Sequence, residues 1–250
     1  MAYFIAQGIN ATFGVLLQLC VALLLASLFL ARASTKEAKG LGTWGIAWLA
    51  QSVAVAALVT RFVLLPNLDM SHLQEGSPQI RALYTTYGVA KVAFFALVAT
   101  ASVHLAPPRG RRRMLAGIWG AALLQACLAA AAAGDLNRVV QWNSPFAAAC
   151  ELLAAFLVWR HAERHPARGR VLAVLLAMAV LALVDVEVFR EMAAPDLAAL
   201  RGFRLWLHGG EAVHYNSYLD VMLHLLLAAG ILDLSRVRGA AARSAPAAPG

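Results

Sequence analysis

The sequence predicts an all-α membrane protein, a bundle of seven transmembrane helices with its N-terminus outside the cell and its C-terminus in the cytoplasm. Of the 250 residues, 61% are hydrophobic and 14% are charged, whereas soluble domains carry about a quarter charged residues. Long apolar runs alternate with short polar connections, and basic residues gather in every second connection. The composition therefore indicates the class, the runs predict the helices, and the basic residues predict the orientation.

Each apolar run is continuous and far longer than a strand of a membrane barrel, so each one predicts a helix. The first run has no positive segment before it and is longer than the core of a signal peptide, so we expect it to be retained. One domain is predicted over residues 1–238, followed by an Ala/Pro-rich, disordered cytoplasmic tail at 239–250. The predicted spans are about 11–31, 42–65, 84–105, 114–134, 145–160, 170–189 and 215–234.

The connections after spans one, three and five, with the tail, hold fourteen basic residues, and the opposite connections hold five. Loops rich in Lys and Arg stay in the cytoplasm, which predicts a multi-pass protein of the bacterial inner membrane. The net charge of +8 does not indicate a nucleic-acid partner, because the arginines form short clusters between apolar runs. We expect these clusters to contact anionic lipid headgroups of the bilayer.

Two smaller features follow from the same pattern. The cysteines Cys20, Cys127 and Cys150 lie within or beside apolar runs, which predicts buried thiols without a disulfide. Residues 196–207 have the spacing of a short amphipathic helix. Such a helix would lie on the outer membrane surface, or alternatively form a lid over an outward cavity.

Ionisable side chains within the spans fall at one depth. A rise of about 1.5 Å per residue places them in the outer half of the membrane, whereas the inner half is almost purely apolar. Each uncompensated charge at this depth costs at least about 2.5–3.5 kcal/mol, so we expect the charges to meet. The excess of acids could be balanced by carboxyl groups that stay protonated, or by a cation, metal or cationic ligand. The residues are Arg61, Lys91, Glu151, Asp185, Glu187 and Asp220, with Glu187 expected to reach back to the interface.

Neighbours on the same helix faces complete a candidate site. Tyr84 and Tyr87 share a face with Lys91, and His224 lies one turn from Asp220. The hypothesis is a water-filled, outward-opening ligand pocket, with Lys91 facing an anionic group and His224 as a hydrogen-bonded relay beneath Asp220. A charge network that only fixes helix packing and a proton or ion path both remain open. The predicted ligand-binding residues are Arg61, Tyr84, Tyr87, Lys91, Glu151, Asp185, Asp220 and His224.

The sequence contains no HExxH motif, no nucleophile elbow and no paired Cys/His signature. We therefore expect no catalytic residue, no metal and no cofactor. An intramembrane hydrolase with a metal at Asp220 and His224 is an alternative, and so is a transport protein that uses the same carboxylates as a cation or proton path.

Three stretches resemble the seven-helix input regions at the N-termini of bacterial sensor histidine kinases and diguanylate cyclases. They are TWGIAWLAQS at 43–52, YGVAKVAFFALVATASVHLA at 87–106 and SYLDVMLHLLLAAGILDLSRVR at 217–238. The resemblance implies a sensor or receptor-like module that binds a small molecule from the outer side and signals to the cytoplasm. No effector segment follows the last span here, which departs from that pattern. Either the chain is a stand-alone receptor module with a separate cytoplasmic signalling partner, or the sequence is a piece of a longer protein. A homodimer remains open.

Overall fold

A computed structural model describes the backbone of residues 2–34, 40–68, 74, 76–162, 165–193 and 211–244. Side chains are described over 12–34, 40–68, 74, 76–162, 165–186 and 217–235. Every regular element within these ranges is a helix, which confirms the all-α class. The predicted amphipathic helix at 196–207 and the side chain of Glu187 lie outside the described residues.

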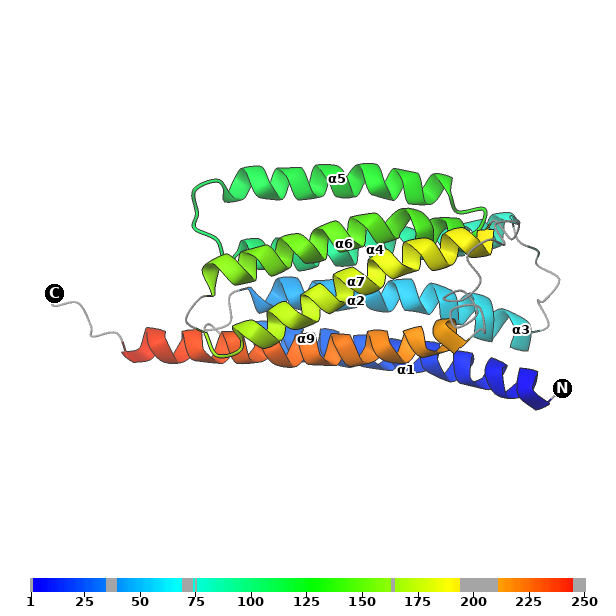
Figure 1. Cartoon of the computed structure of the whole chain (residues 1–250), viewed down its shortest axis with the longest axis horizontal. Coiled ribbons are helices and arrows are strands. Elements are labelled where there is room, and N and C mark those ends of the chain that lie inside the picture. The colour runs from blue at the N-terminus through cyan, green and yellow to red at the C-terminus, as the bar shows by residue number, and fades with distance from the viewer. Residues whose placement is uncertain are drawn as a thin grey trace.

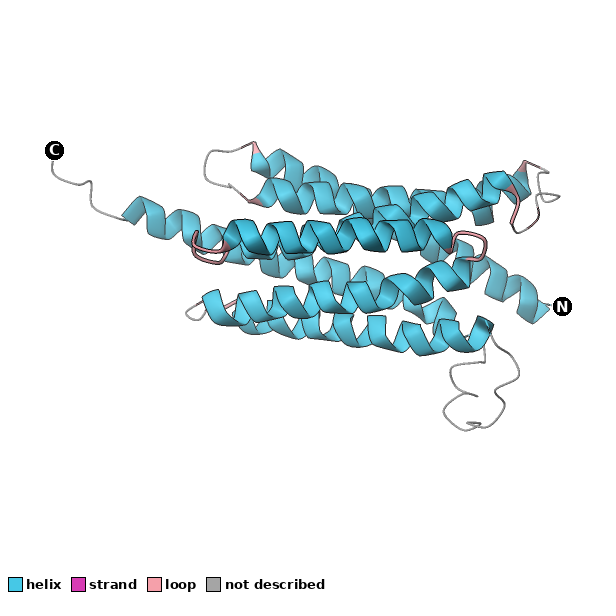
Figure 2. Cartoon of the chain, turned by 90° about the horizontal axis from the view of Figure 1, so that it is seen from above, coloured by secondary structure: helices cyan, strands magenta, loops and turns pink. Residues whose placement is uncertain are grey.

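Within the described residues, seven long helices run side by side along one axis and alternate in direction (Figures 1 and 2). The second continues without a break through a π-helical turn, η1, and the short α3. We call the end of the bundle at which α1 begins the N-terminal end, and the opposite end the C-terminal end. The elements are α1 (Ala2–Ala33), α2 (Leu41–Val59), η1 (Thr60–Leu64), α3 (Leu65–Asn67), α4 (Pro78–Val103), α5 (Arg111–Ala131), α6 (Leu136–His161), α7 (Arg168–Ala193) and α9 (Glu211–Ser244).

Six of the long helices form a closed ring, in the packing order α1, α2, α4, α6, α7, α9 and back to α1. The remaining helix, α5, lies outside this ring and packs only on α4 and α6 among the major helix pairs (Figure 1). Its outward face carries exposed Trp119, Leu123 and Leu124, and only small parts of its surface are buried. The bundle therefore has an interior enclosed by six helices, which is where a site can form.

Six helices within the described ranges are long and apolar enough to cross a membrane. The helix α6 is 26 residues long but is not among them. It carries Glu151 and a polar first part, and it lies in the ring between α4 and α7. A multi-pass membrane protein is supported, while passage of α6 through the membrane stays a prediction.

Helix boundaries differ from the predicted spans where polar residues begin or end a helix. The predicted span at 145–160 is nine residues too short at its start, because α6 begins at Leu136, capped by Asp135, whose side chain accepts from the Asn137 N–H at 2.9 Å. Pro145 lies inside this helix rather than at its start. The last helix, α9, continues to Ser244, so residues 239–244 of the predicted tail are helical, and 245–250 lie outside the described residues.

Three close approaches of helices depend on glycine. A Cβ on Gly45 of α2 would lie 2.7 Å from Leu30 of α1, and one on Gly88 of α4 would lie 2.8 Å from Val139 of α6. A Cβ on Gly230 of α9 would lie 2.5 Å from a methyl carbon of Val171 in α7. These distances are shorter than van der Waals contact, so the small residue is what lets the helix backbones approach.

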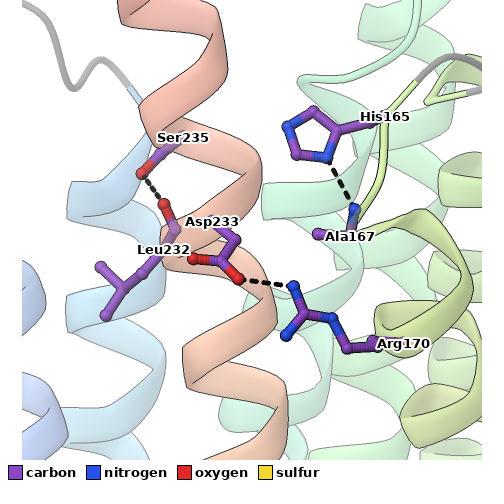
Figure 3. Close-up of polar contacts among 6 residues, drawn as sticks. All are labelled: His165, Ala167, Arg170, Leu232, Asp233 and Ser235. Carbon is purple, nitrogen blue, oxygen red and sulfur yellow. Dashed lines mark hydrogen bonds and ion pairs between the residues drawn. The ribbon is translucent and has the colours of Figure 1, made fainter.

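Three polar contacts lie near the crossing of α7 and α9, at the C-terminal end of the bundle (Figure 3). One joins the two helices, and the other two are local. Arg170 of α7 donates to the carboxylate of Asp233 in α9 at 2.6 Å, and Ser235 donates to the Leu232 carbonyl at 2.7 Å. The backbone N–H of Ala167 donates to Nδ1 of His165 at 3.0 Å in the turn before α7. Both side chains of the Arg170 and Asp233 pair are substantially exposed, so this pair adds little stability.

All three cysteines have free thiols, and Cys150 is buried as predicted. The prediction of burial was wrong for Cys20 and Cys127, which are exposed on the outer surface of the bundle. An apolar run does not reveal which face of a helix points inward, because the lipid-facing side of a membrane bundle is apolar as well.

Candidate ligand-binding cavity

A cavity of about 450 Å³ lies inside the ring of six helices, in the half nearer the N-terminal end. Leu136 and Asn137, the first residues of α6, form part of its wall, so the cavity reaches the end of the bundle. Its volume is in the range of small-molecule sites, about 300–1,000 Å³. The polar residues that line it are Thr12, Gln18, Tyr87, Lys91, Asn137, Glu151, Asp185, Ser217 and Asp220.

The cavity brings together five of the eight predicted ligand-binding residues. Tyr87 and Lys91 come from α4, Glu151 from α6, Asp185 from α7 and Asp220 from α9. Charged groups from four helices thus share one cavity, as the common depth of these residues predicted. The structure contains no ligand, so their role in binding stays a prediction.

The other three predicted residues do not line the cavity. Tyr84 is 1% exposed and packs with Ile80 and Val139 where α6 covers α4. It shares a helix face with Lys91 but lies two turns nearer the N-terminal end, where the neighbouring helix fills the space. Arg61 lies in η1, with its guanidinium 5.7 Å from the centre of the Phe62 ring. His224 lies on the C-terminal side of the cavity and is treated below.

Asp220 has a hydrogen-bond donor on one side and an imidazole ring on the other. Gln18 of α1 donates from Nε2 to Asp220 Oδ2 at 3.1 Å, and the same nitrogen lies 3.4 Å from the Ser217 carbonyl oxygen. On the other side, Nε2 of His224 lies 3.6 Å from Oδ1 of Asp220. That distance is longer than a hydrogen bond, so the predicted hydrogen-bonded relay is not formed in this conformation.

His224 is enclosed by aromatic rings that close the cavity on its C-terminal side. Its ring lies edge-on to Trp48 of α2 at 4.8 Å between centroids, and edge-on to Phe94 of α4 at 5.4 Å. Trp48 and Phe94 are 0% exposed and His224 is 4% exposed. This aromatic layer continues into the main apolar core of the C-terminal half.

Glu151 differs from Asp220 in having an oxygen without a partner. The residue is 2% exposed, and its Oε2 has no hydrogen-bond partner within the described part of the chain. Most buried polar atoms in proteins are hydrogen-bonded, because an unsatisfied group loses its interaction with water. Glu151 also lines the cavity, so a donor group of a ligand that approached this carboxyl group would supply the missing partner.

Lys91 also lines the cavity without an ion pair. Its Nζ lies 5.7 Å from the centre of the Phe95 ring on the next turn of α4, which is a cation–π contact. No carboxylate oxygen of the described residues lies within 4.0 Å of this ammonium. Lys91 therefore lines the same cavity as Glu151 without forming an ion pair with it.

The π-helical turn shapes the wall near the N-terminal end. The Leu65 N–H donates to the Thr60 carbonyl five residues earlier, which defines the wider turn. Phe62 and Val63 of this turn line the cavity. Turns of this kind occur mostly as single insertions in helices and often mark functional sites.

The predicted ligand-binding residues did not include Gln18 or Asn137. Gln18 lies at the level of Asp220, since the two side chains are hydrogen-bonded. A polar amide within the first apolar run was a usable signal, but only ionisable residues entered the prediction. Asn137 lies in a stretch that was assigned to a connection, so nothing indicated that it belonged to a helix.

Within the residues that the structure describes, no group of three or more His, Cys, Asp or Glu side chains converges as a metal site would. His208 and the side chain of His214 lie outside that part of the chain. Comparison of the chain with protein-family models, characterised proteins and solved structures found no match. The resemblance to sensor input regions therefore stays a prediction.

Proposed function

We propose that this protein is a membrane-embedded sensor or receptor-like module, which binds a small molecule in the cavity from the outer side and signals to a cytoplasmic partner. In this proposal all seven long helices cross the inner membrane, with the N-terminal end outside and the C-terminal end in the cytoplasm. The observation that carries it is the cavity of about 450 Å³ whose lining residues include Glu151, a buried residue with one unsatisfied oxygen.

Two features favour ligand binding over a purely structural charge network. A network that served only packing would pair Lys91 with the carboxylates, yet no ion pair joins them among the described residues. The Lys91 ammonium without an ion pair and the Glu151 carboxyl group with an unsatisfied oxygen cost stability, and a ligand or water molecules would recover part of that cost.

The aromatic layer favours a receptor over a transport protein. Trp48, Phe94 and His224 pack together on the C-terminal side of the cavity, and the core beyond them is mainly apolar, with buried Thr100 and Ser102 as its polar residues on α4. A solute path would need polar groups through that half as well. A cavity that opens at one end of the bundle and ends at an aromatic layer is the arrangement expected of a binding site.

The last helix is the element that would carry the signal. Asp220 in the cavity wall and Asp233 near the C-terminal end belong to the same α9, which continues to Ser244. A ligand that changes the contacts of Asp220 would favour one position of α9 relative to α1 and α7, as a shift between two populations. The partner would then meet a different arrangement of the C-terminal end.

The test is a ligand screen on the purified protein in lipid nanodiscs, read as the thermal unfolding midpoint. We expect at least one compound to raise the midpoint of the wild type and to lose this effect in Glu151→Gln. Asp233→Asn, on the same bundle but far from the cavity, is the matched control and should respond as the wild type does. Equal responses of wild type and Glu151→Gln to every compound would contradict the proposal.

A further inference from the structure

The chemistry of the cavity wall indicates a class of ligand. This inference rests on the function proposed above. It starts from two unpaired groups of opposite charge, the ammonium of Lys91 and the carboxylate of Glu151, on adjacent packed helices α4 and α6. In a protein interior, where the effective dielectric constant is lower than in water, each charge gains more from a direct partner than it would in solution.

The available hydrogen-bonding capacity differs between the carboxylates. Asp220 already accepts from Gln18 at 3.1 Å and has His224 at 3.6 Å. Glu151 is 2% exposed, with Oε2 unsatisfied among the described residues. A donor group of a ligand would therefore satisfy Glu151 first.

Lys91 presents the complementary group. Its ammonium has a ring face beside it at 5.7 Å and can still donate to an anion inside the cavity. A ligand with only a positive charge would leave the Lys91 ammonium without an anionic partner. A ligand with only a negative charge would leave Glu151 unsatisfied.

The remaining walls are mainly apolar. Val55, Leu58, Met178, Leu181 and Phe95 come from α2, α7 and α4, so the body of the ligand should be apolar as well.

We propose that the cavity binds a small zwitterion, with an ammonium group at Glu151, a carboxylate at Lys91 and an apolar body between the helices. Amino acids with apolar side chains are the simplest molecules of this class. One ligand would then pair both charges of the wall at once.

The experiment uses matched probes on the full chain in lipid nanodiscs, with binding measured by calorimetry. Norleucine carries both charges, pentylamine is the same molecule without the carboxylate, and hexanoate is the same molecule without the amine. Other apolar amino acids and 6-aminohexanoate vary the body and the spacing of the charges. We expect at least one zwitterion to bind at least about tenfold more tightly than its singly charged analogues, because each missing group leaves a buried partner unsatisfied.

Two substitutions test which side chain binds which charged group of the ligand. Lys91→Met should reduce the affinity for the zwitterion to that for the amine, and Glu151→Gln should reduce it to that for the carboxylate. Lys91→Arg should retain most of the affinity, and Asp233→Asn should bind as the wild type does. The unfolding midpoint without ligand reports whether each variant is folded.

The outcomes separate this inference from the function on which it rests. Binding of pentylamine or of hexanoate as tight as that of the zwitterion overturns the inference and leaves a ligand-binding module. Zwitterion affinity unchanged in both Lys91→Met and Glu151→Gln overturns it too. If no zwitterion binds but another compound from the screen does, the inference is contradicted and the proposed ligand-binding function is not. If no compound binds at all, the inference and the proposed function are both contradicted.

Discussion

At the scale of single residues, Glu151 and Asp220 both line the cavity, but their carboxyl groups have different surroundings. Asp220 is partly exposed to the cavity and accepts a hydrogen bond from Gln18, whereas Glu151 is 2% exposed with one oxygen unsatisfied. A partnered carboxylate contributes to the native structure, and an unpartnered one reduces its stability. The two residues should therefore respond in opposite ways to removal of their charge.

We expect Glu151→Gln to raise the unfolding free energy of the ligand-free protein by about 1–3 kcal/mol, because an uncompensated buried charge is removed. The measurement is reversible unfolding in mixed micelles at fixed lipid composition. A loss of stability would show that Glu151 is an essential partner in a packing network.

Gln18→Leu should lower the unfolding free energy by about 1–3 kcal/mol, since Asp220 loses a hydrogen-bond donor. The control is Cys20→Ala, two residues further along α1, where the side chain is exposed and the effect should be small. A double-mutant cycle of Gln18→Leu with Asp220→Asn should give a coupling of about 0.5–3 kcal/mol. Additive effects would mean that the contact between α1 and α9 carries no energy.

At the scale of elements, the crossing of α7 and α9 combines a close backbone approach with an exposed ion pair. A Cβ on Gly230 would lie 2.5 Å from Val171, whereas Arg170 and Asp233 form their pair at the surface (Figure 3). Packing therefore decides how these two helices meet, and the ion pair adds little to it.

Gly230→Ala should lower the unfolding free energy by about 1–3 kcal/mol, because the added methyl group overfills the interface. Arg170→Ala at the same crossing should change it by less than about 1 kcal/mol. Gly117→Ala in α5 meets no atom within 4 Å and should be neutral or stabilising. The contrary result, a larger effect from Arg170→Ala than from Gly230→Ala, would make the ion pair the main contact.

At the scale of the whole molecule, the alternating helices place the start of α1 and the end of α9 at opposite ends (Figure 1). This arrangement agrees with an odd number of spans, but α6 is not one of the six helices that qualify by hydropathy. Its polar residues face the cavity and the neighbours α4 and α5: Glu151 lines the cavity, and Asn143 Nδ2 donates to the Gly88 carbonyl at 3.1 Å. A helix whose polar residues face other helices or a cavity can cross a membrane despite such residues.

Single cysteines in a background without Cys20, Cys127 and Cys150 would test both the orientation and the passage of α6. Gly134→Cys lies before α6 and Pro166→Cys after it, and Pro108→Cys precedes α5. In intact spheroplasts, an impermeant thiol reagent should label only Gly134→Cys, and the other two should require permeabilisation. Labelling of Gly134→Cys and Pro166→Cys from the same side would exclude passage of α6, and the reverse pattern would invert the orientation.

The helical class and the depth of the charged residues could be predicted from the sequence, because hydropathy and residue spacing along a helix are local properties. Lys91, Glu151, Asp185 and Asp220 were expected to meet on that basis, and they line one cavity. The start of α6 was missed, because its first residues are polar and Pro145 suggested a boundary.

Only the tertiary structure decided which faces point inward. Tyr84 and Tyr87 share one helix face in the sequence, yet neighbouring α6 covers the first and leaves the second in the cavity wall. Cys20 and Gln18 lie two residues apart, but one is exposed on the outer surface and the other holds Asp220. In a membrane protein both the core and the lipid-facing surface are apolar, so hydropathy sets the depth of a residue along its helix, whereas its rotation and its partners come from the packing of other helices.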